Sequence, residues 1–197
     1  MFLNKDTDRA SRRSASLLDT DRSILLIIDA QEKFRDAIPE MESLGARIAI
    51  LAKAAARLGI PVLVTEQYPK GLGSTLPVIK AALPPGTPIF EKMVFSAGDV
   101  PEWMDALKAS KRDQFVFCGV ESHVCVLQTA LDLIQNVEGQ VYVVEDAVGS
   151  RKPSDKEAAH RRLETHAAQW VSTEMVFFEW LRRAGTSEFK ELQGLIK

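Results

Sequence analysis

The feature that most constrains the fold of this sequence is the regular alternation of two kinds of segment. Short, continuous apolar runs rich in β-branched residues recur six times, and helix-length amphipathic stretches separate them. Apolar runs without polar alternation are typical of strands that are covered on both faces. The runs are residues 24–28, 61–65, 88–91, 114–117, 140–144 and 168–171. The predicted helices are residues 38–58, 75–83, 100–110, 122–135, 154–166, 174–183 and 189–196.

Strands that alternate with helices predict β-α-β units, whose right-handed crossovers make the strands parallel. The chain has 197 residues, too few for a barrel of eight such units. We therefore predict a doubly wound, six-stranded parallel sheet with helices on both faces, a Rossmann-like three-layer α/β/α sandwich. This domain would span residues 21–197, after an N-terminal arm over residues 1–20 that is frayed or contacts another copy. Sites in such sheets form at the carboxyl ends of the strands, near the reversal of strand order.

Composition and charge exclude several classes of function. The net charge of −2 gives no electrostatic attraction to nucleic acid or acidic membranes, so we expect a small-molecule partner. Two cysteines are too few for a disulfide framework, and with three scattered histidines they do not suggest a zinc site. No apolar run approaches the roughly 20 residues that span a bilayer, and the N-terminal residues lack the apolar core of a secretory signal. We expect a cytoplasmic protein without a cofactor.

Cys125 is the cysteine with a candidate chemical role. Gly119 permits a sharp turn after the fourth predicted strand, and Ser122 is a good helix N-cap, so Cys125 falls in the first helical turn. Unpaired N–H groups and the helix dipole favour a thiolate there, which predicts a pKa below the ordinary value of about 8.5. The same N–H groups would stabilise an oxyanion. The alternative is a buried small hydrophobic residue, which is our interpretation of Cys118, inside the strand.

Two charged residues occupy corresponding places at the ends of other predicted strands. Asp29 follows the first strand, which neighbours the fourth in a doubly wound sheet, so Asp29 and Cys125 should face one crevice. A carboxylate there can exchange protons with a thiol or a leaving group, although an Asp after a strand is also a common loop cap. Lys92 closes the third strand, and its charge would favour an ionised carboxylate and thiolate. Taken alone, Lys92 is equally consistent with a solvated surface residue.

An Asp, a Lys and a Cys in this order and at these strand ends resemble the isochorismatase-like hydrolase superfamily, which includes nicotinamidases and N-carbamoylsarcosine amidohydrolases. The segment Cys118-Gly-Val-Glu-Ser-His-Val-Cys125 is similar to the nucleophile turn of that family. The segment Thr65-Glu-Gln-Tyr-Pro-Lys-Gly-Leu-Gly73 further resembles the branch of isochorismatase domain-containing proteins. The resemblance extends from about residue 21 to the end of the chain.

This resemblance implies a catalytic triad of Asp29, Lys92 and Cys125, and a homo-oligomeric protein. It also implies a cis peptide bond between Val120 and Glu121, and an oxyanion hole formed by the Glu121 and Cys125 N–H groups. In the implied reaction, Cys125 attacks an amide carbonyl and Asp29 protonates the departing amine, which leaves a thioester. Asp29 then activates the water that releases the acid.

The stretch after the second predicted strand departs from the nicotinamidase pattern. Nicotinamidases carry an Asp and histidines there that bind a metal, whereas this chain has Glu66-Gln-Tyr-Pro-Lys70, without histidine. We therefore predict no metal, and nicotinamide is disfavoured as a substrate. The side chains expected to bind the substrate are Gln31, Phe34, Tyr68, Leu72 and Phe95.

Two alternatives to an amidase remain open. True isochorismatases cleave a vinyl ether and do not need the cysteine, so a vinyl-ether hydrolase acting through Asp29 and Lys92 is the alternative among enzymes. The presence of Cys125 favours acyl-group chemistry over it. The alternative among other classes is a non-catalytic oligomeric interaction protein on the same fold.

Overall fold

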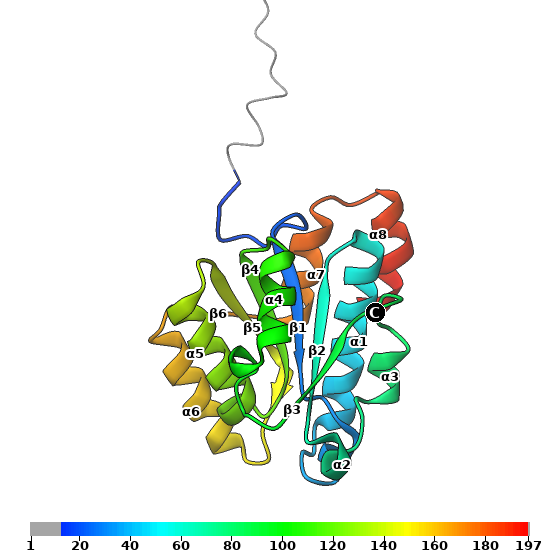
Figure 1. Ribbon diagram of the computed structural model, residues 1–197. Helices are drawn as coiled ribbons and strands as arrows, with labels where there is room; N and C mark the ends of the chain where they lie inside the picture. Colours follow the sequence, from blue (N-terminus) through cyan, green and yellow to red (C-terminus); the bar gives the residue numbers. More distant parts are fainter. Residues whose placement is uncertain (1–12, 197) are drawn as a thin grey trace, which may run out of the picture.

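The computed structural model describes residues 13–196, so most of the predicted N-terminal arm lies outside the described residues. A central sheet has helices on both faces (Figure 1). Its strands are parallel and ordered β3-β2-β1-β4-β5-β6, which confirms the predicted doubly wound sandwich. They are β1 (Ser23–Ile28), β2 (Val62–Gln67), β3 (Ile89–Lys92), β4 (Gln114–Val120), β5 (Gln140–Gly149) and β6 (Gln169–Val171). The order reverses between β1 and β4.

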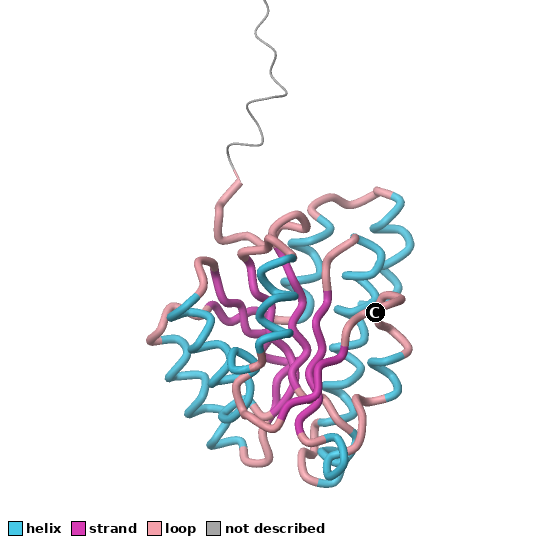
Figure 2. Tube along the Cα trace, in the orientation of Figure 1, coloured by secondary structure: helices cyan, strands magenta, loops and turns pink. Residues whose placement is uncertain are grey.

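Two hydrophobic cores lie on opposite faces of the sheet, between the strands and the two groups of helices (Figure 2). One core is covered by α1 (Met41–Leu58), α3 (Pro77–Lys80), α7 (Thr173–Leu181) and α8 (Ser187–Leu192). The other is covered by α4 (Pro101–Ala109), α5 (Leu127–Asn136) and α6 (Pro153–Glu164). In β1, Leu25 and Ile27 enter the first core, whereas Leu26 and Ile28 enter the second. This burial on both faces explains the uninterrupted apolar run of β1.

The prediction of one helix over residues 75–83 is wrong. The segment after β2 contains two single-turn helices, α2 (Pro69–Leu72) and α3. Each begins at a proline, and the residue before Pro77 is extended, with φ −48° and ψ 134°. Proline disfavours the helical conformation in the residue that precedes it, so the chain cannot run through this point as one helix.

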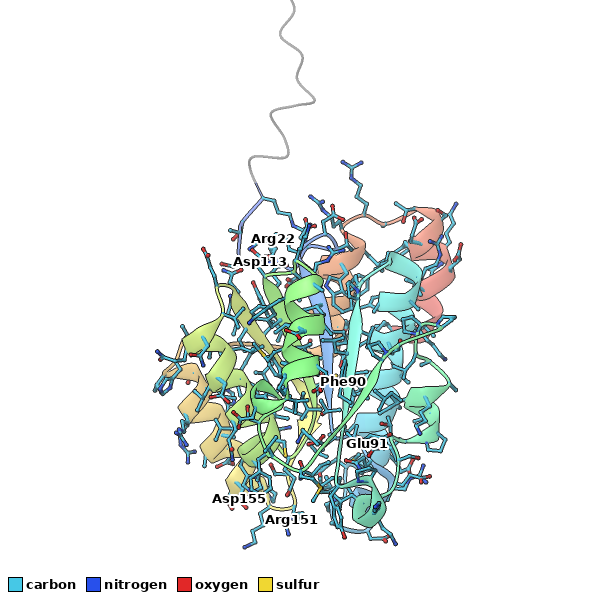
Figure 3. The ribbon with its side chains drawn as sticks, in the orientation of Figure 1. Arg22, Phe90, Glu91, Asp113, Arg151 and Asp155 are labelled. Atoms are coloured by element: carbon cyan, nitrogen blue, oxygen red, sulfur yellow. The ribbon has the colours of Figure 1, made fainter. Side chains whose placement is uncertain are left out.

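The first described residues pack on the domain. The Arg13 guanidinium donates hydrogen bonds of 2.8 Å to the carbonyl oxygens of Leu18 and Glu179, and the Tyr142 hydroxyl donates to Ser16 O at 2.9 Å. Arg22 forms a two-pronged ion pair with Asp113 at the amino ends of the strands (Figure 3). Within residues 13–196, no helix is long and apolar enough to cross a membrane.

Gly119 lies near the end of β4, next to the backbone of β1. It pairs with Ile28 in the sheet and adopts a φ of 117°, which L side chains rarely adopt. A Cβ atom at this position would overlap the Ile28 carbonyl oxygen and lie 2.7 Å from the carbonyl carbon. Glycine is therefore required here by backbone contact as well as by conformation.

We expect Gly119→Ala to lower the free energy of unfolding by more than about 3 kcal/mol, because two strands of the sheet must separate to admit the methyl group. The matched control is Gly59→Ala. Gly59 also has a positive φ, of 69°, but nothing lies within 4 Å of its added Cβ, so only the conformational cost of about 1 kcal/mol applies. Urea unfolding of both variants measures the difference, and equal destabilisation would contradict this explanation.

Candidate active site

Asp29 and Lys92 form a buried ion pair at the carboxyl edge of the sheet. Lys92 Nζ lies 2.7 Å from Asp29 Oδ2, and both side chains are almost fully buried. Asp29 directly follows β1 and Lys92 is the last residue of β3, so the pair spans the end of β2, the strand between them. From β2, the Thr65 hydroxyl donates a hydrogen bond of 2.7 Å to Asp29 Oδ1. The structure therefore brings these two predicted residues together.

The Lys92 ammonium also has neutral acceptors around it. It donates to Gln67 Oε1 at 2.7 Å, to Phe95 O at 3.0 Å and to Val94 O at 3.3 Å. A buried charge is tolerated when it is paired and its remaining donors are satisfied, and both conditions hold here. Sequence reasoning missed Gln67. The available signal was its position at the end of β2, at the same edge as Asp29 and Lys92.

Cys125 completes the cluster. It lies in a π-helical turn, Ser122–Val126, that connects β4 to α5, and its side chain is buried. Asp29 and Lys92 are the charged residues that shift the pKa of its thiol. Asp29 Oδ2 is ion-paired with Lys92, but no group within residues 13–196 makes an aligned hydrogen bond to it. This oxygen is therefore available to accept the thiol proton.

The expectation of a lowered pKa at Cys125 is wrong. The pKa of the Cys125 thiol is raised to about 12, chiefly by burial and also by the Asp29 charge, while Lys92 opposes both effects. Cys125 is only 6% exposed, so loss of hydration outweighs the helix terminus and the lysine. The resting group is a neutral thiol beside a carboxylate.

Burial also raises the pKa of Cys118, whose thiol donates to Leu26 O at 3.6 Å inside the sheet, as expected for a structural cysteine.

The backbone before Cys125 has the expected cis peptide bond between Val120 and Glu121. The Glu121 carbonyl accepts hydrogen bonds from Val124 N at 3.1 Å and Val126 N at 3.3 Å. It accepts none from the Cys125 N–H, which lies between them in the sequence. The Glu121 N–H donates to no backbone or side-chain acceptor within residues 13–196. Ser122 does not act as the predicted N-cap, because its hydroxyl donates to Gly149 O at 3.0 Å.

A pocket of about 340 Å³ opens at Cys125. Of the five residues expected to bind substrate, Phe34, Leu72 and Phe95 line it, whereas Gln31 and Tyr68 do not. The other lining residues, which sequence reasoning did not single out for binding, are Lys33, Ala37, Gln67, Glu121, Val124 and Arg151.

Gln31 and Tyr68 lie outside this lining for different reasons. The fully buried Gln31 side chain accepts from Gln67 N at 2.7 Å and donates to Gln67 O at 3.0 Å and to Gly73 O at 2.6 Å. It thereby ties the segment that carries Leu72 to the end of β2. Tyr68 is 48% exposed.

The residues at the end of β2 do not fit the metal-binding pattern of nicotinamidases. Glu66 Oε1 accepts hydrogen bonds from Thr75 N at 2.7 Å and Thr75 Oγ1 at 2.8 Å, and lies 3.6 Å from Lys80 Nζ. Gln67 is engaged by Lys92. Within the described part of the chain, no three His, Cys, Asp or Glu side chains gather as metal ligands would.

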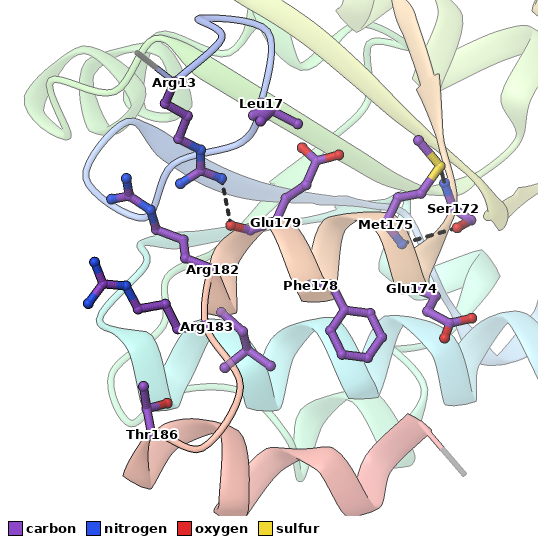
Figure 4. Close-up of a pocket in the computed structure, with 11 residues that line it drawn as sticks. Arg13, Leu17, Ser172, Glu174, Met175, Phe178, Glu179, Arg182, Arg183 and Thr186 are labelled. Carbon is purple, nitrogen blue, oxygen red and sulfur yellow. Dashed lines mark hydrogen bonds between the residues drawn. The ribbon is translucent and has the colours of Figure 1, made fainter. Parts of the chain in front are cut away.

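A larger hollow, of about 1060 Å³, runs along α7 and is lined by residues such as Arg13, Met175, Phe178 and Arg182 (Figure 4). It contains none of the residues predicted to carry chemistry. The smaller pocket is the candidate site because Cys125 lines it, together with Gln67, whose side chain accepts a hydrogen bond from Lys92 of the buried ion pair.

The pKa of Cys125 makes its alkylation a test of this geometry. Below a pKa of about 12 the thiolate fraction rises tenfold per pH unit, so the rate with iodoacetamide should climb steadily from pH 7 to 10. Cys118 should label far more slowly. A plateau below pH 8, or equal labelling of the two cysteines, would contradict the assigned cause.

Comparison with known proteins gives the chain its family. Residues 23–175 match the Isochorismatase domain. The chain is 38% identical to mouse isochorismatase domain-containing protein 2A, over 95% of this chain and 89% of the relative. A solved structure described as MAR1 ribonuclease from Caenorhabditis elegans is 39% identical, with a TM-score of 0.87 and 92% of each chain covered. The Escherichia coli YcaC product, described as an octameric hydrolase of unknown specificity, shares the fold at 24% identity and a TM-score of 0.85, over 93% and 92% of the chains. The chain belongs to the isochorismatase family.

Proposed function

We propose that this protein is an amidase-type cysteine hydrolase that cleaves a small amide C–N bond through a thioester on Cys125. The observation that carries the proposal is the neutral Cys125 thiol beside the buried Asp29–Lys92 pair, at a pocket of small-molecule size. A thiol, a proton acceptor and a fixed positive charge are the groups that acyl transfer to sulfur requires.

In the proposed first half-reaction, Sγ attacks the amide carbonyl carbon while the thiol proton passes to Asp29. The oxyanion that forms would accept hydrogen bonds from the Glu121 and Cys125 N–H groups. Asp29 then returns the proton to the amide nitrogen, the C–N bond breaks and the amine departs, which leaves a thioester. A thiol with a raised pKa needs a base for attack, so the roles of Asp29 and Cys125 depend on each other.

In the second half-reaction, the oxygen of a water molecule attacks the thioester carbonyl carbon while Asp29 takes a proton from that water. The C–S bond then breaks, the acid leaves and Asp29 returns the proton to sulfur. Lys92 stays protonated throughout and offsets the negative charge that moves between Asp29, sulfur and the oxyanion. No step uses a metal or a cofactor.

Two alternatives predict different behaviour. A vinyl-ether hydrolase would work through Asp29 and Lys92 without the thiol. A non-catalytic oligomeric protein would need none of the three residues for chemistry. The Caenorhabditis elegans relative is also named a ribonuclease. For this chain, the net charge of −2 and the mainly apolar pocket favour a small molecule over RNA.

We also propose that the protein is cytoplasmic and homo-oligomeric. Its two cysteines are both free and buried, as suits a reducing compartment. The YcaC product, which shares the fold, is described as octameric.

The test is a panel of small amides, a vinyl ether and an RNA oligonucleotide, assayed with the full chain. We expect ammonia or amine release from at least one amide, and a fall of at least about 10³-fold in kcat/KM for Cys125→Ala and for Asp29→Asn. Cys118→Ala, a cysteine variant outside the site, should keep wild-type kcat/KM. Vinyl-ether cleavage that survives Cys125→Ala, or turnover of RNA alone, would contradict the amidase proposal.

A further inference from the structure

The charges around the Cys125 pocket are unequal. Its walls are mainly apolar, from Phe34, Leu72, Phe95 and Val124, but Lys33 and Arg151 also line it. Glu121 is the acidic residue in the lining, and it is already engaged. Its Oε1 accepts hydrogen bonds of 3.0 Å from both the backbone N–H and the Nε of Arg151.

The two cations at the pocket retain donors without acceptors. Arg151 uses Nε for Glu121, and its terminal nitrogens donate to no other group of residues 13–196. Its side chain is 60% exposed, whereas that of Glu121 is 8% exposed, so the guanidinium lies at the mouth and the carboxylate below it. Lys33 forms no ion pair or hydrogen bond within the described part of the chain.

Four of the charges at or behind the pocket cancel in pairs. Asp29 balances Lys92, and Glu121 balances Arg151, so Lys33 leaves the pocket with a net charge of +1. Glu32 and Asp36, in the same turn as Lys33, do not line the pocket. An anion at the mouth would meet one uncompensated ammonium and the open edge of a guanidinium, which binds carboxylates with well-defined geometry.

We infer that the substrate is an amide that carries a carboxylate at its far end, joined to the scissile amide by a short apolar or aromatic spacer. The amide carbonyl would lie at Cys125, the spacer against Phe34, Leu72 and Phe95, and the carboxylate at Lys33 and Arg151. This inference rests on the proposed function for the identity of the scissile bond, but the charge preference is a binding property that can be measured separately.

The test uses two probes of the same shape, 4-carbamoylbenzoate and its neutral counterpart benzene-1,4-dicarboxamide. Calorimetric titration of the Cys125→Ala protein, which has no nucleophile, separates binding from turnover. We expect the anion to bind at least about fivefold more tightly than the neutral amide at low salt. Lys33→Gln should remove most of this preference, and raised ionic strength should reduce it.

Two further variants separate the charge at the pocket from charge nearby. Lys152→Gln removes the same charge from a neighbour of Arg151 that does not line the pocket, so it should preserve the preference. Arg151→Lys keeps a positive charge beside the buried Glu121 carboxylate but loses the planar fork of donors, so it should weaken anion binding while the protein stays folded.

Equal affinity for the two probes, or a preference that Lys33→Gln leaves intact, would overturn the inference. If the anion is preferred but wild-type protein hydrolyses no amide, the proposed function fails, whereas the preference of the pocket for a carboxylate stands. If neutral amides are hydrolysed faster than anionic ones, the proposed function stands and the inference fails.

Discussion

The buried ion pair between Asp29 and Lys92 is the interaction on which the rest of the site depends. It joins the ends of β1 and β3 across β2 at a distance of 2.7 Å. Either charge alone would be strongly unfavourable in this setting, because neither side chain reaches solvent. The groups that hydrogen-bond to the pair belong to the same unit. Asp29 Oδ1 accepts from the Thr65 hydroxyl, and the Lys92 ammonium donates to the Gln67 amide oxygen and to the Val94 and Phe95 carbonyls.

This arrangement explains why the proposed nucleophile is held as a thiol. A thiolate at Cys125 would be a second negative charge against Asp29 in a place with little water. In the proposed mechanism the negative charge forms on sulfur only as the proton moves to Asp29 and the oxyanion develops, so the cluster keeps a constant total charge through attack. Lys92 stabilises each form because it lies beside both partners.

Much of the fold was predictable because burial on both faces leaves continuous apolar strands, as in β1. The meeting of Asp29 and Lys92 followed from the shared edge at which parallel strands end. The sign of the Cys125 pKa shift was not predictable, because it depends on how completely the turn is buried. The hydrogen bonds of Gln31 to Gln67 and Gly73, and the place of Arg151 in the pocket lining, could not be predicted from the sequence either. Both depend on which way a side chain points from a loop, and no periodic pattern records that.

Membership of the family fixes the fold, but it does not select the reaction. What separates the three functional alternatives is whether an acyl group is ever bonded to Cys125. An acyl group on Cys125 can be told apart from one on Cys118, because Cys118 is fully buried inside the sheet.

The most direct measurement is rapid quenching of the full chain with 4-nitrophenyl acetate, followed by intact-mass and peptide analysis. We expect a burst of one nitrophenolate per chain and one acetyl group on Cys125 that hydroxylamine removes, with neither in Cys125→Ala. Absence of a burst, or acetylation confined to lysines and resistant to hydroxylamine, would contradict a thioester mechanism.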